Sequence, residues 1–250
     1  MKYEEMAQVV EITRRGEYVL FVVRAPRIAH EAQPGQFVNI RVSDSLDPLL
    51  RRPLSIADRD GDTLRFLFQI RGKGTALLAN KKRGDELSLV GPLGKSFPKV
   101  KGELIFIGGG VGVAPFVWLR RVYPEAFLIV GARSRSLLPP LEWFGENNLC
   151  MATDDGSVGI KGTVIDALQG MDLSTKSVFA CGPHRMLSAL AYFFSQHAPD
   201  IEAYFSTESR MACGFGACKG CILPRRDDEH YALCCSDGPV FHWKEIAWEK

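Results

Sequence analysis

The amino-acid sequence predicts a multi-domain protein. We expect an antiparallel β-barrel over residues 1–98, a doubly wound parallel α/β domain over residues 99–205, and a small cysteine-rich segment over residues 206–250. Three observations support this division. Short alternating apolar stretches fill the first part, strands alternate with helical stretches in the second, and five of the seven cysteines lie between residues 213 and 235. A length of 250 residues also exceeds the roughly 100–200 residues of one typical domain.

The barrel prediction rests on four stretches separated by Gly, Asp and Pro. They alternate apolar with polar residues and are rich in β-branched and aromatic side chains, a pattern typical of short antiparallel strands. The stretches are QVVEITRRGEYVLFVVRAP, PGQFVNIRV, RPLSIADRDGDTLRFLFQI and GDELSLVGPLG.

The α/β prediction begins at an apolar strand, Leu104 to Ile107, which runs into glycines and then into a helical stretch. Further strands are expected at AFLIVGA, LCMATDD and SVFACGP, and further helices near GTVIDALQG and at HRMLSALAYFFSQH. Strands that alternate with helices predict a parallel sheet with helices on both faces.

Composition narrows the possible binding partners and the cellular compartment. Lys and Arg number 31 against 29 Asp and Glu, without a block of like charges, which argues against a polyanionic partner. The N-terminus lacks the pattern of a signal peptide and no window reaches about 18 apolar residues, so we expect a soluble, cytoplasmic protein. In that reducing compartment, clustered cysteines point to metal rather than to disulfides.

Two turns of the α/β part are candidate nucleotide sites. IGGGVGVAP, with Gly108, Gly109, Gly110, Gly112 and Pro115, joins a strand to a helix, where backbone N–H groups favour a phosphate. The turn at Cys181, Gly182 and Pro183 ends another strand and should face the same crevice, because ligands collect at the carboxyl ends of parallel strands. The alternatives are a merely tight turn and a buried cysteine.

Two stretches of the barrel are candidates for a second anionic ligand. RRPLSI joins Arg51 and Arg52 to the hydroxyl of Ser55, and QIRGKGT offers backbone N–H groups and the hydroxyl of Thr75. Together they suit the diphosphate of a dinucleotide. The alternative for the arginine pair is a solvated surface.

The cysteines carry the strongest signal. Their spacing, C-x4-C-x2-C followed by a distant cysteine, is typical of a plant-type [2Fe-2S] cluster. Zinc is the alternative, but zinc sites usually pair two short knuckles or add histidines. Of the adjacent Cys234 and Cys235 only one is expected to be a ligand, because neighbours in an extended segment point to opposite sides.

These motifs, in this order, resemble the ferredoxin-reductase superfamily. Leu54 stands where that superfamily's R-x-Y-S motif has an aromatic residue. Over essentially the whole chain the sequence is more similar to the family of electron-transfer subunits of class 1B dihydroorotate dehydrogenases. The stretches that carry this similarity are RRPLSI, GKGT, GPLG, IGGGVGVAP, TDDGS, CGP, ESRMACGFGACKGC and CSDGPVF.

The resemblance implies three sets of site residues and no catalytic side chain. FAD would be held by Arg52, Pro53, Leu54, Ser55, Leu67, Phe68, Gln69, Gly74 and Thr75. The nicotinamide nucleotide would be framed by Gly108 to Pro115 and Cys181 to Pro183, with Asp154 as a candidate ribose ligand that favours NADH over NADPH. The [2Fe-2S] cluster would be held by Cys213, Cys218, Cys221 and Cys235.

The same resemblance implies an oxidoreductase that exchanges electrons between a one-electron and a two-electron carrier. It would take electrons from an FMN-containing dihydroorotate dehydrogenase catalytic subunit, in a heterotetramer of two of each chain, and deliver them to NAD in pyrimidine biosynthesis. One alternative is an NAD(P)H reductase subunit for a ferredoxin, a hydrogenase or a sulfur-reducing partner. Another is a zinc-stabilised nucleotide-binding module without catalysis.

Overall fold

A computed structural model describes residues 1–145, 147–227 and 230–248 and contains two compact units. Unit 1 comprises Met1–Ser96, Ser209–Ile222 and Leu233–Pro239. Unit 2 comprises Phe97–Glu208, Leu223–Ala232 and Val240–Lys250. The predicted segment 206–250 is therefore distributed over both units, and its residues 228–229 and 249–250 lie outside the described part of the chain.

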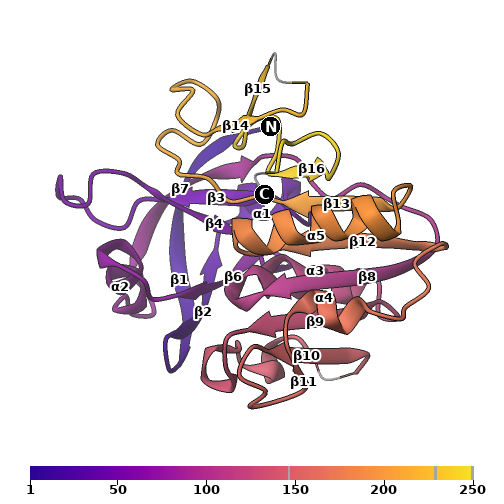
Figure 1. The fold of residues 1–250 in the computed structure, drawn as a ribbon. Helices are drawn as coiled ribbons and strands as arrows, with labels where there is room; N and C mark the ends of the chain where they lie inside the picture. The colour runs from indigo at the N-terminus through magenta and orange to yellow at the C-terminus, as the bar shows by residue number, and fades with distance from the viewer. Residues whose placement is uncertain (146, 228–229, 249–250) are drawn as a thin grey trace. The chain divides into compact units, whose positions relative to one another are not determined.

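Unit 1 is built on an antiparallel sheet of order β4-β3-β7-β1-β2-β6-β5 (Figure 1). Contact between β4 and β6 brings strands from opposite sides of the sheet together, so the sheet curls. This confirms the predicted antiparallel barrel-like domain. Its elements are β1 (Tyr3–Arg15), β2 (Tyr18–Arg24), α1 (Pro26–Glu31), β3 (Phe37–Ile40), β4 (Arg52–Ser55), β5 (Asp58–Asp60), β6 (Thr63–Gln69), α2 (Lys73–Ala79) and β7 (Glu86–Leu93).

The sequence explains these strands locally. Gly16, with φ of +59°, makes the hairpin turn between β1 and β2, a conformation that glycine adopts without steric cost. Phe21 of β2 is the partner of Phe66 in the ladder with β6, and the ring of Phe21 meets that of Phe68 edge to face at 6.1 Å. Such pairs add to the free energy gained by burying apolar area.

Unit 2 is built on a sheet of order β11-β10-β9-β8-β12-β13-β16, in which only β16 runs antiparallel to its neighbour. A separate two-stranded sheet pairs β14 with β15. The strands are β8 (Glu103–Gly109), β9 (Phe127–Ala132), β10 (Leu149–Thr153), β11 (Ile160–Lys161), β12 (Lys176–Cys181), β13 (Glu202–Ser206), β14 (Ile222–Pro224), β15 (Tyr231–Leu233) and β16 (Val240–His242). The helices are α3 (Ala114–Val122), α4 (Val164–Leu168) and α5 (His184–His197), with 3₁₀ turns η1 (Gly110–Val113), η2 (Arg135–Leu137) and η3 (Leu141–Trp143).

Helices cover both faces of this sheet. Ile105 and Ile107 of β8 face a core that α4 and α5 share. The intervening Phe106 faces the other side, where its ring stacks on Phe116 of α3 at 5.1 Å. Successive residues of a strand point to opposite faces, so a strand covered on both sides is apolar throughout. The arrangement confirms the predicted doubly wound domain. No helix in the described residues is long and apolar enough to cross a membrane.

Candidate functional site

In unit 2, the two predicted nucleotide turns lie against each other at the carboxyl ends of β8 and β12. Gly108 and Cys181 are partners in the parallel ladder between these strands. A Cβ added at Gly112 would lie 2.3 Å from the carbonyl oxygen of Cys181, and one added at Gly109 would lie 2.7 Å from Pro183 Cδ. Side chains at these two positions would therefore force the turns apart.

The remaining residues of the glycine turn shape the backbone. Gly110 has φ of +53° and begins η1, and Pro115 lies in the first turn of α3, where its missing N–H costs nothing. Gly110 is partly exposed while its neighbours Gly109 and Gly112 are buried. Packing accounts for the glycines at 109 and 112, whereas Gly110 and Val111 are partly exposed and offer the accessible part of the turn.

Two aspartates follow β10, and their carboxylates differ. Asp155 Oδ1 accepts hydrogen bonds from the backbone N–H of Ser157 at 2.9 Å and from its hydroxyl at 2.6 Å. The hydroxyl and backbone N–H of Ser157 hold the pKa of Asp155 below its ordinary value. Ser157 Oγ in turn accepts from Arg135 N at 2.8 Å. Asp155 therefore builds the turn, and the exposed Asp154 is the better candidate for a ribose hydroxyl.

In unit 1, the predicted flavin stretches RPLS and GKGT also meet. RPLS is strand β4, and the Arg52 guanidinium lies against the first turn of α2, so that a Cβ at Gly74 would be 2.3 Å from Arg52 Nε. Arg52 also donates to the carbonyl of Leu50. A fixed guanidinium beside the backbone amides of Lys73 and Gly74 suits a diphosphate.

Two other predicted flavin positions use their polar atoms within the protein. Thr75 Oγ1 accepts from the backbone N–H groups of Arg71 at 2.9 Å and Gly72 at 3.2 Å, and so caps α2. Gln69 donates to Glu17 at 2.8 Å. Leu67 and Phe68 are buried in β6, whereas all four residues of β4, Leu54 included, are half-buried. Of the predicted flavin stretches, β4 and the first turn of α2 are therefore more accessible to a ligand than β6.

The cysteine loop, residues 213–221, has no helix or strand before residue 222. Gly214 and Gly216 have φ of 80° and 92°, conformations that strongly favour glycine. These turns direct backbone N–H groups toward sulfur. Cys218 N donates to Cys213 Sγ at 3.4 Å, and Gly216 N donates to Cys235 Sγ at 3.1 Å. Cys235 N donates to Cys221 Sγ at 3.4 Å.

The pKa values of the Cys213 and Cys235 thiols shift in opposite directions. Burial acts to raise the pKa of Cys213, but the N–H groups of Cys218, Phe215 and Ala217 outweigh it and lower the pKa to about 6. Burial, followed by the neighbouring Cys221, raises the pKa of Cys235 to about 12, which the N–H of Gly216 only partly opposes. Cys213, Cys221 and Cys235 are therefore close enough to influence one another.

Comparison with known proteins identifies the family. The electron transfer subunit of dihydroorotate dehydrogenase B (NAD(+)) from Geobacillus kaustophilus is 39% identical over 228 residues, covering 86% of this chain and 86% of that protein. The corresponding subunit of Lysinibacillus sphaericus is 36% identical over 248 residues, covering 93% of this chain and 90% of the relative. The chain belongs to the family of dihydroorotate dehydrogenase B electron transfer subunits. The expected resemblance is confirmed.

Two further comparisons agree with this membership. Residues 208–247 match the family model of the iron-sulfur cluster binding domain of dihydroorotate dehydrogenase B, which argues against the zinc alternative. The structure of an NADH-dependent reduced ferredoxin-NADP oxidoreductase superposes with a TM-score of 0.84 at 28% identity and covers 97% of this chain and 90% of that one. A ferredoxin reductase of carbazole 1,9a-dioxygenase, at 21% identity and a TM-score of 0.68, shares the fold.

The donor set of this electron transfer subunit suits a [2Fe-2S] cluster. Such a cluster distributes four thiolates over two irons and accepts hydrogen bonds at its sulfurs. Amides directed at Cys213, Cys221 and Cys235 match that requirement.

The choice between Cys234 and Cys235 remains a prediction. Both are buried, so burial does not separate them. Gly216 N–H, from within the loop, points at the sulfur of Cys235, whereas Cys234 N donates to the carbonyl of Cys221 at 2.9 Å. The hydrogen bond from Gly216 supports Cys235 as the fourth ligand.

Sequence reasoning missed one residue beside the loop. Asn39 is fully buried in β3, and its Nδ2 donates to the carbonyl of Cys213 at 3.0 Å. The available signal was a single carboxamide in the otherwise apolar run FVNI. A buried polar side chain of this kind needs a partner, but the sequence does not reveal which one.

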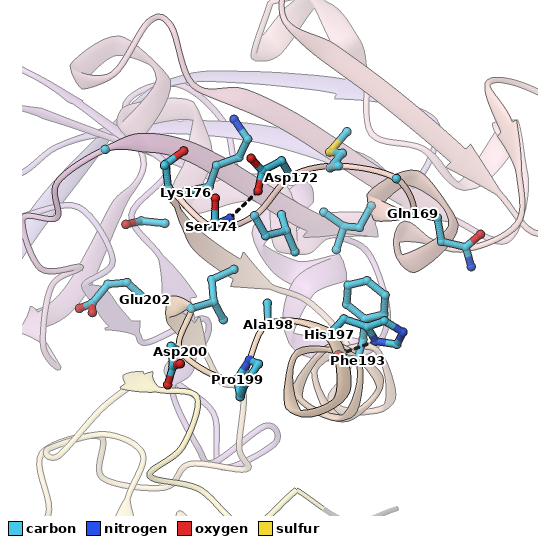
Figure 2. Close-up of a pocket in the computed structure, with 18 of the residues that line it drawn as sticks. Gln169, Asp172, Ser174, Lys176, Phe193, His197, Ala198, Pro199, Asp200 and Glu202 are labelled. Carbon is cyan, nitrogen blue, oxygen red and sulfur yellow. Dashed lines mark hydrogen bonds between the residues drawn. The ribbon is translucent and has the colours of Figure 1, made fainter.

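A cavity of about 1010 Å³ lies elsewhere in unit 2, and none of the predicted site residues lines it. Figure 2 shows Lys176 and Glu202, which begin β12 and β13, on one side, and the end of α5 with Phe193 and His197 on another. The cavity thus lies at the amino ends of parallel strands, whereas ligands of such sheets bind at the carboxyl ends.

Proposed function

We propose that this electron transfer subunit takes electrons from an FMN-containing dihydroorotate dehydrogenase catalytic subunit and delivers them to NAD. Membership of the family supports the activity, the FAD and [2Fe-2S] cofactors and the existence of a catalytic partner. An assembly of two copies of each chain and a cytoplasmic location are finer predictions.

One observation carries this proposal. The flavin stretches and the predicted cluster ligands belong to the same compact unit, and Asn39 connects them. Asn39 pairs with Pro53 of the flavin strand in the ladder between β3 and β4, and its side chain donates to the carbonyl of Cys213. The barrel therefore holds the cysteine loop one strand away from the RPLS motif.

The residues divide the work as follows. Arg52 offers a fixed positive charge, and the half-buried strand β4 offers its edge, to FAD. The turns around Gly110 and Cys181 provide the nicotinamide nucleotide site, and Asp154 is the ribose ligand that selects NADH. Cys213, Cys218, Cys221 and Cys235 hold the cluster. When bound, FAD exchanges two electrons with a nicotinamide and single electrons with an iron-sulfur cluster, which makes conversion between the two possible.

The purified full chain provides the test. It should reduce artificial acceptors with NADH but should not oxidise dihydroorotate, since its predicted sites account for cofactors alone. Adding an FMN-containing catalytic subunit should restore NAD-dependent orotate formation. Orotate formation by the chain alone would contradict the subunit assignment. Co-purification with a ferredoxin or hydrogenase, and with no FMN protein, would favour the reductase alternative.

A further inference from the structure

Asn39 occupies a costly position in the barrel. It lies at the third residue of β3, all four residues of which are buried, and its own side chain has no exposed area. Its Oδ1 atom is buried without a hydrogen-bond partner among the described residues. An apolar residue of similar shape would avoid that penalty, because a buried acceptor that lacks a donor loses its hydration without compensation. Stability of the barrel alone therefore does not explain an asparagine here.

The two sides of β3 meet different parts of unit 1. Val38 lies near Ile28 of α1, since both side chains crowd a Cβ built at Gly91. Phe37 and Asn39 point to the opposite side, because side chains alternate along a strand. There Phe37 lies beside Pro239, both within 3.0 Å of a Cβ built at Gly94, and Asn39 bonds to the carbonyl of Cys213. The Phe37–Asn39 side is thus covered by the segment that carries the cysteines.

The contact with the cysteine loop is tight as well as polar. A Cβ added at Gly214 would lie 2.1 Å from Asn39 Nδ2, so the carboxamide fills the space beside the residue that follows Cys213. Gly214 also has φ of 80°. Its lack of a side chain thus serves the backbone turn and the approach of Asn39 at once.

We infer that Asn39 is a positioning residue for the [2Fe-2S] cluster, acting through Cys213. By holding the Cys213 carbonyl on the barrel, its Nδ2 group fixes the peptide between Cys213 and Gly214. The following turn then directs N–H groups back to the Cys213 sulfur, as the 3.4 Å bond from Cys218 N shows. Hydrogen bonds to cluster sulfurs help to set the reduction potential and retain the cluster. This inference rests on the proposed cluster ligands.

The decisive experiment compares Asn39→Leu with the wild-type full chain, purified anaerobically. The variant keeps the approximate volume but lacks the donor. We expect the cluster absorbance to bleach roughly five- to tenfold faster under an iron chelator, the effect of losing one hydrogen bond. We also expect a changed EPR spectrum of the reduced cluster and a lower midpoint potential, with FAD content unchanged. Identical bleaching and identical spectra would overturn the inference.

Two further variants keep the result interpretable. Val38→Ala perturbs the same strand on its other side, so it should lower the melting temperature but leave bleaching and EPR as in wild type. If that control changed the cluster equally, a general loosening of β3 would explain the data and the inference would fail. Asn39→Ala also lacks the donor and adds no bulk. If Asn39→Leu does not fold, faster bleaching of Asn39→Ala supports the inference, and wild-type behaviour refutes it.

The readouts separate this inference from the proposed function. Cluster retention, EPR and potential are measured on the chain without a partner or dihydroorotate. A chain that proves to serve a different partner would leave the Asn39 result unaffected. Conversely, if the cluster in Asn39→Leu behaved as in wild type, the positioning role of Asn39 would be refuted, and the proposed electron transfer to NAD would be unaffected.

Discussion

Two glycine-rich segments, the turn 108–112 of unit 2 and the loop 213–221 of unit 1, differ in what holds their backbones in place. In the turn, Gly112 makes room for a neighbouring backbone, the carbonyl of Cys181. In the loop, Gly214 and Gly216 have backbone angles that other residues rarely adopt. The turn is fixed by β8, which pairs with β9 and β12 on its two sides, whereas the loop has no ladder before residue 222.

This difference indicates which segment has its conformation before its ligand binds. The turn 108–112 continues directly from β8, which is paired on both sides. The sheet therefore determines the conformation of the turn before a nucleotide binds. The cysteine loop is held by N–H groups that donate to sulfur at 3.1–3.4 Å and by Asn39. Binding free energy of a metal centre commonly contributes directly to folding. We therefore expect perturbations of the loop to be felt at the cluster, and perturbations of the turn to be felt in stability and nucleotide binding.

The largest expected effect is on the loop. Cys235→Ser should abolish or strongly perturb the [2Fe-2S] absorbance and EPR signal, because one of the four proposed ligands is lost, while FAD stays bound. Cys234→Ser is the matched control and should keep the cluster. Iron, labile sulfide and flavin content measure both. Reversed outcomes would mean that Cys234 is the ligand and that the assignment of the C-terminal segment is one residue off.

The next effect concerns the turn. Gly112→Ala places a methyl group 2.3 Å from the Cys181 carbonyl oxygen, and overpacking of this kind costs about 1–3 kcal/mol. We expect a lower free energy of unfolding and a higher KM for NADH in acceptor reduction, with the EPR spectrum of the cluster unchanged. Denaturant unfolding and steady-state kinetics are the measurements. An altered cluster with an unaltered KM would break the comparison between turn and loop.

A smaller effect is expected at the proposed nucleotide site. Asp154→Ser removes the carboxylate that we propose repels a 2′-phosphate. The ratio of kcat/KM with NADPH to kcat/KM with NADH should therefore rise roughly five- to tenfold, which corresponds to about the energy of one exposed charge pair. Asp155→Asn is the control. Because Asp155 holds the turn through Ser157, its replacement should lower kcat/KM with NADH and with NADPH by similar factors. A wild-type preference in Asp154→Ser would exclude Asp154 as the selecting residue.

The smallest effect lies in the fold of unit 2. Thr163 caps α4, and Asp166 Oδ2 accepts from the backbone N–H of Thr163 at 2.7 Å and from its hydroxyl at 2.8 Å. Thr163→Ala should cost about 1 kcal/mol, or roughly 2–4 °C in melting temperature, and leave the cluster content unchanged. Loss of cluster in this variant would contradict the separation between the two regions.

The same cap gives a pH dependence. The Thr163 N–H lowers the pKa of Asp166 below its ordinary 3.8, so the stabilisation is present above that value and is lost as pH falls through the lowered pKa. The stability difference between wild type and Asp166→Asn should shrink below about pH 4 and be constant near neutrality. Thermal unfolding across pH tests this, and a difference that grows in acid would contradict it.

Much of the fold and part of the site were predictable from the sequence. Alternation along the first 98 residues and the strand-helix rhythm after Leu104 gave both fold classes, since local periodicity determines which face of an element is buried. The meeting of the glycine turn with Cys181 followed from topology, because carboxyl ends of adjacent parallel strands lie together.

Other features depend on contacts that no local pattern encodes. The hydroxyl of Thr75 was assigned by type to a ligand, yet it bonds to its own turn. Asn39 lies 174 residues from Cys213 in sequence, so nothing near either residue indicates their hydrogen bond. The antiparallel addition of β16 to β13 likewise joins segments whose local sequences give no partner.

The chain crosses between its two units five times, after residues 96, 208, 222, 232 and 239. Neither unit therefore corresponds to one continuous stretch of gene, and the residues of the cluster segment are shared between the two units. The order of synthesis has a second effect. A ribosome that has not passed residue 235 has yet to supply the predicted fourth ligand, and β13 still presents an unpaired edge because β16 follows later. Completion of both units, and with it protection of that edge, requires that residues 235–242 have been synthesised.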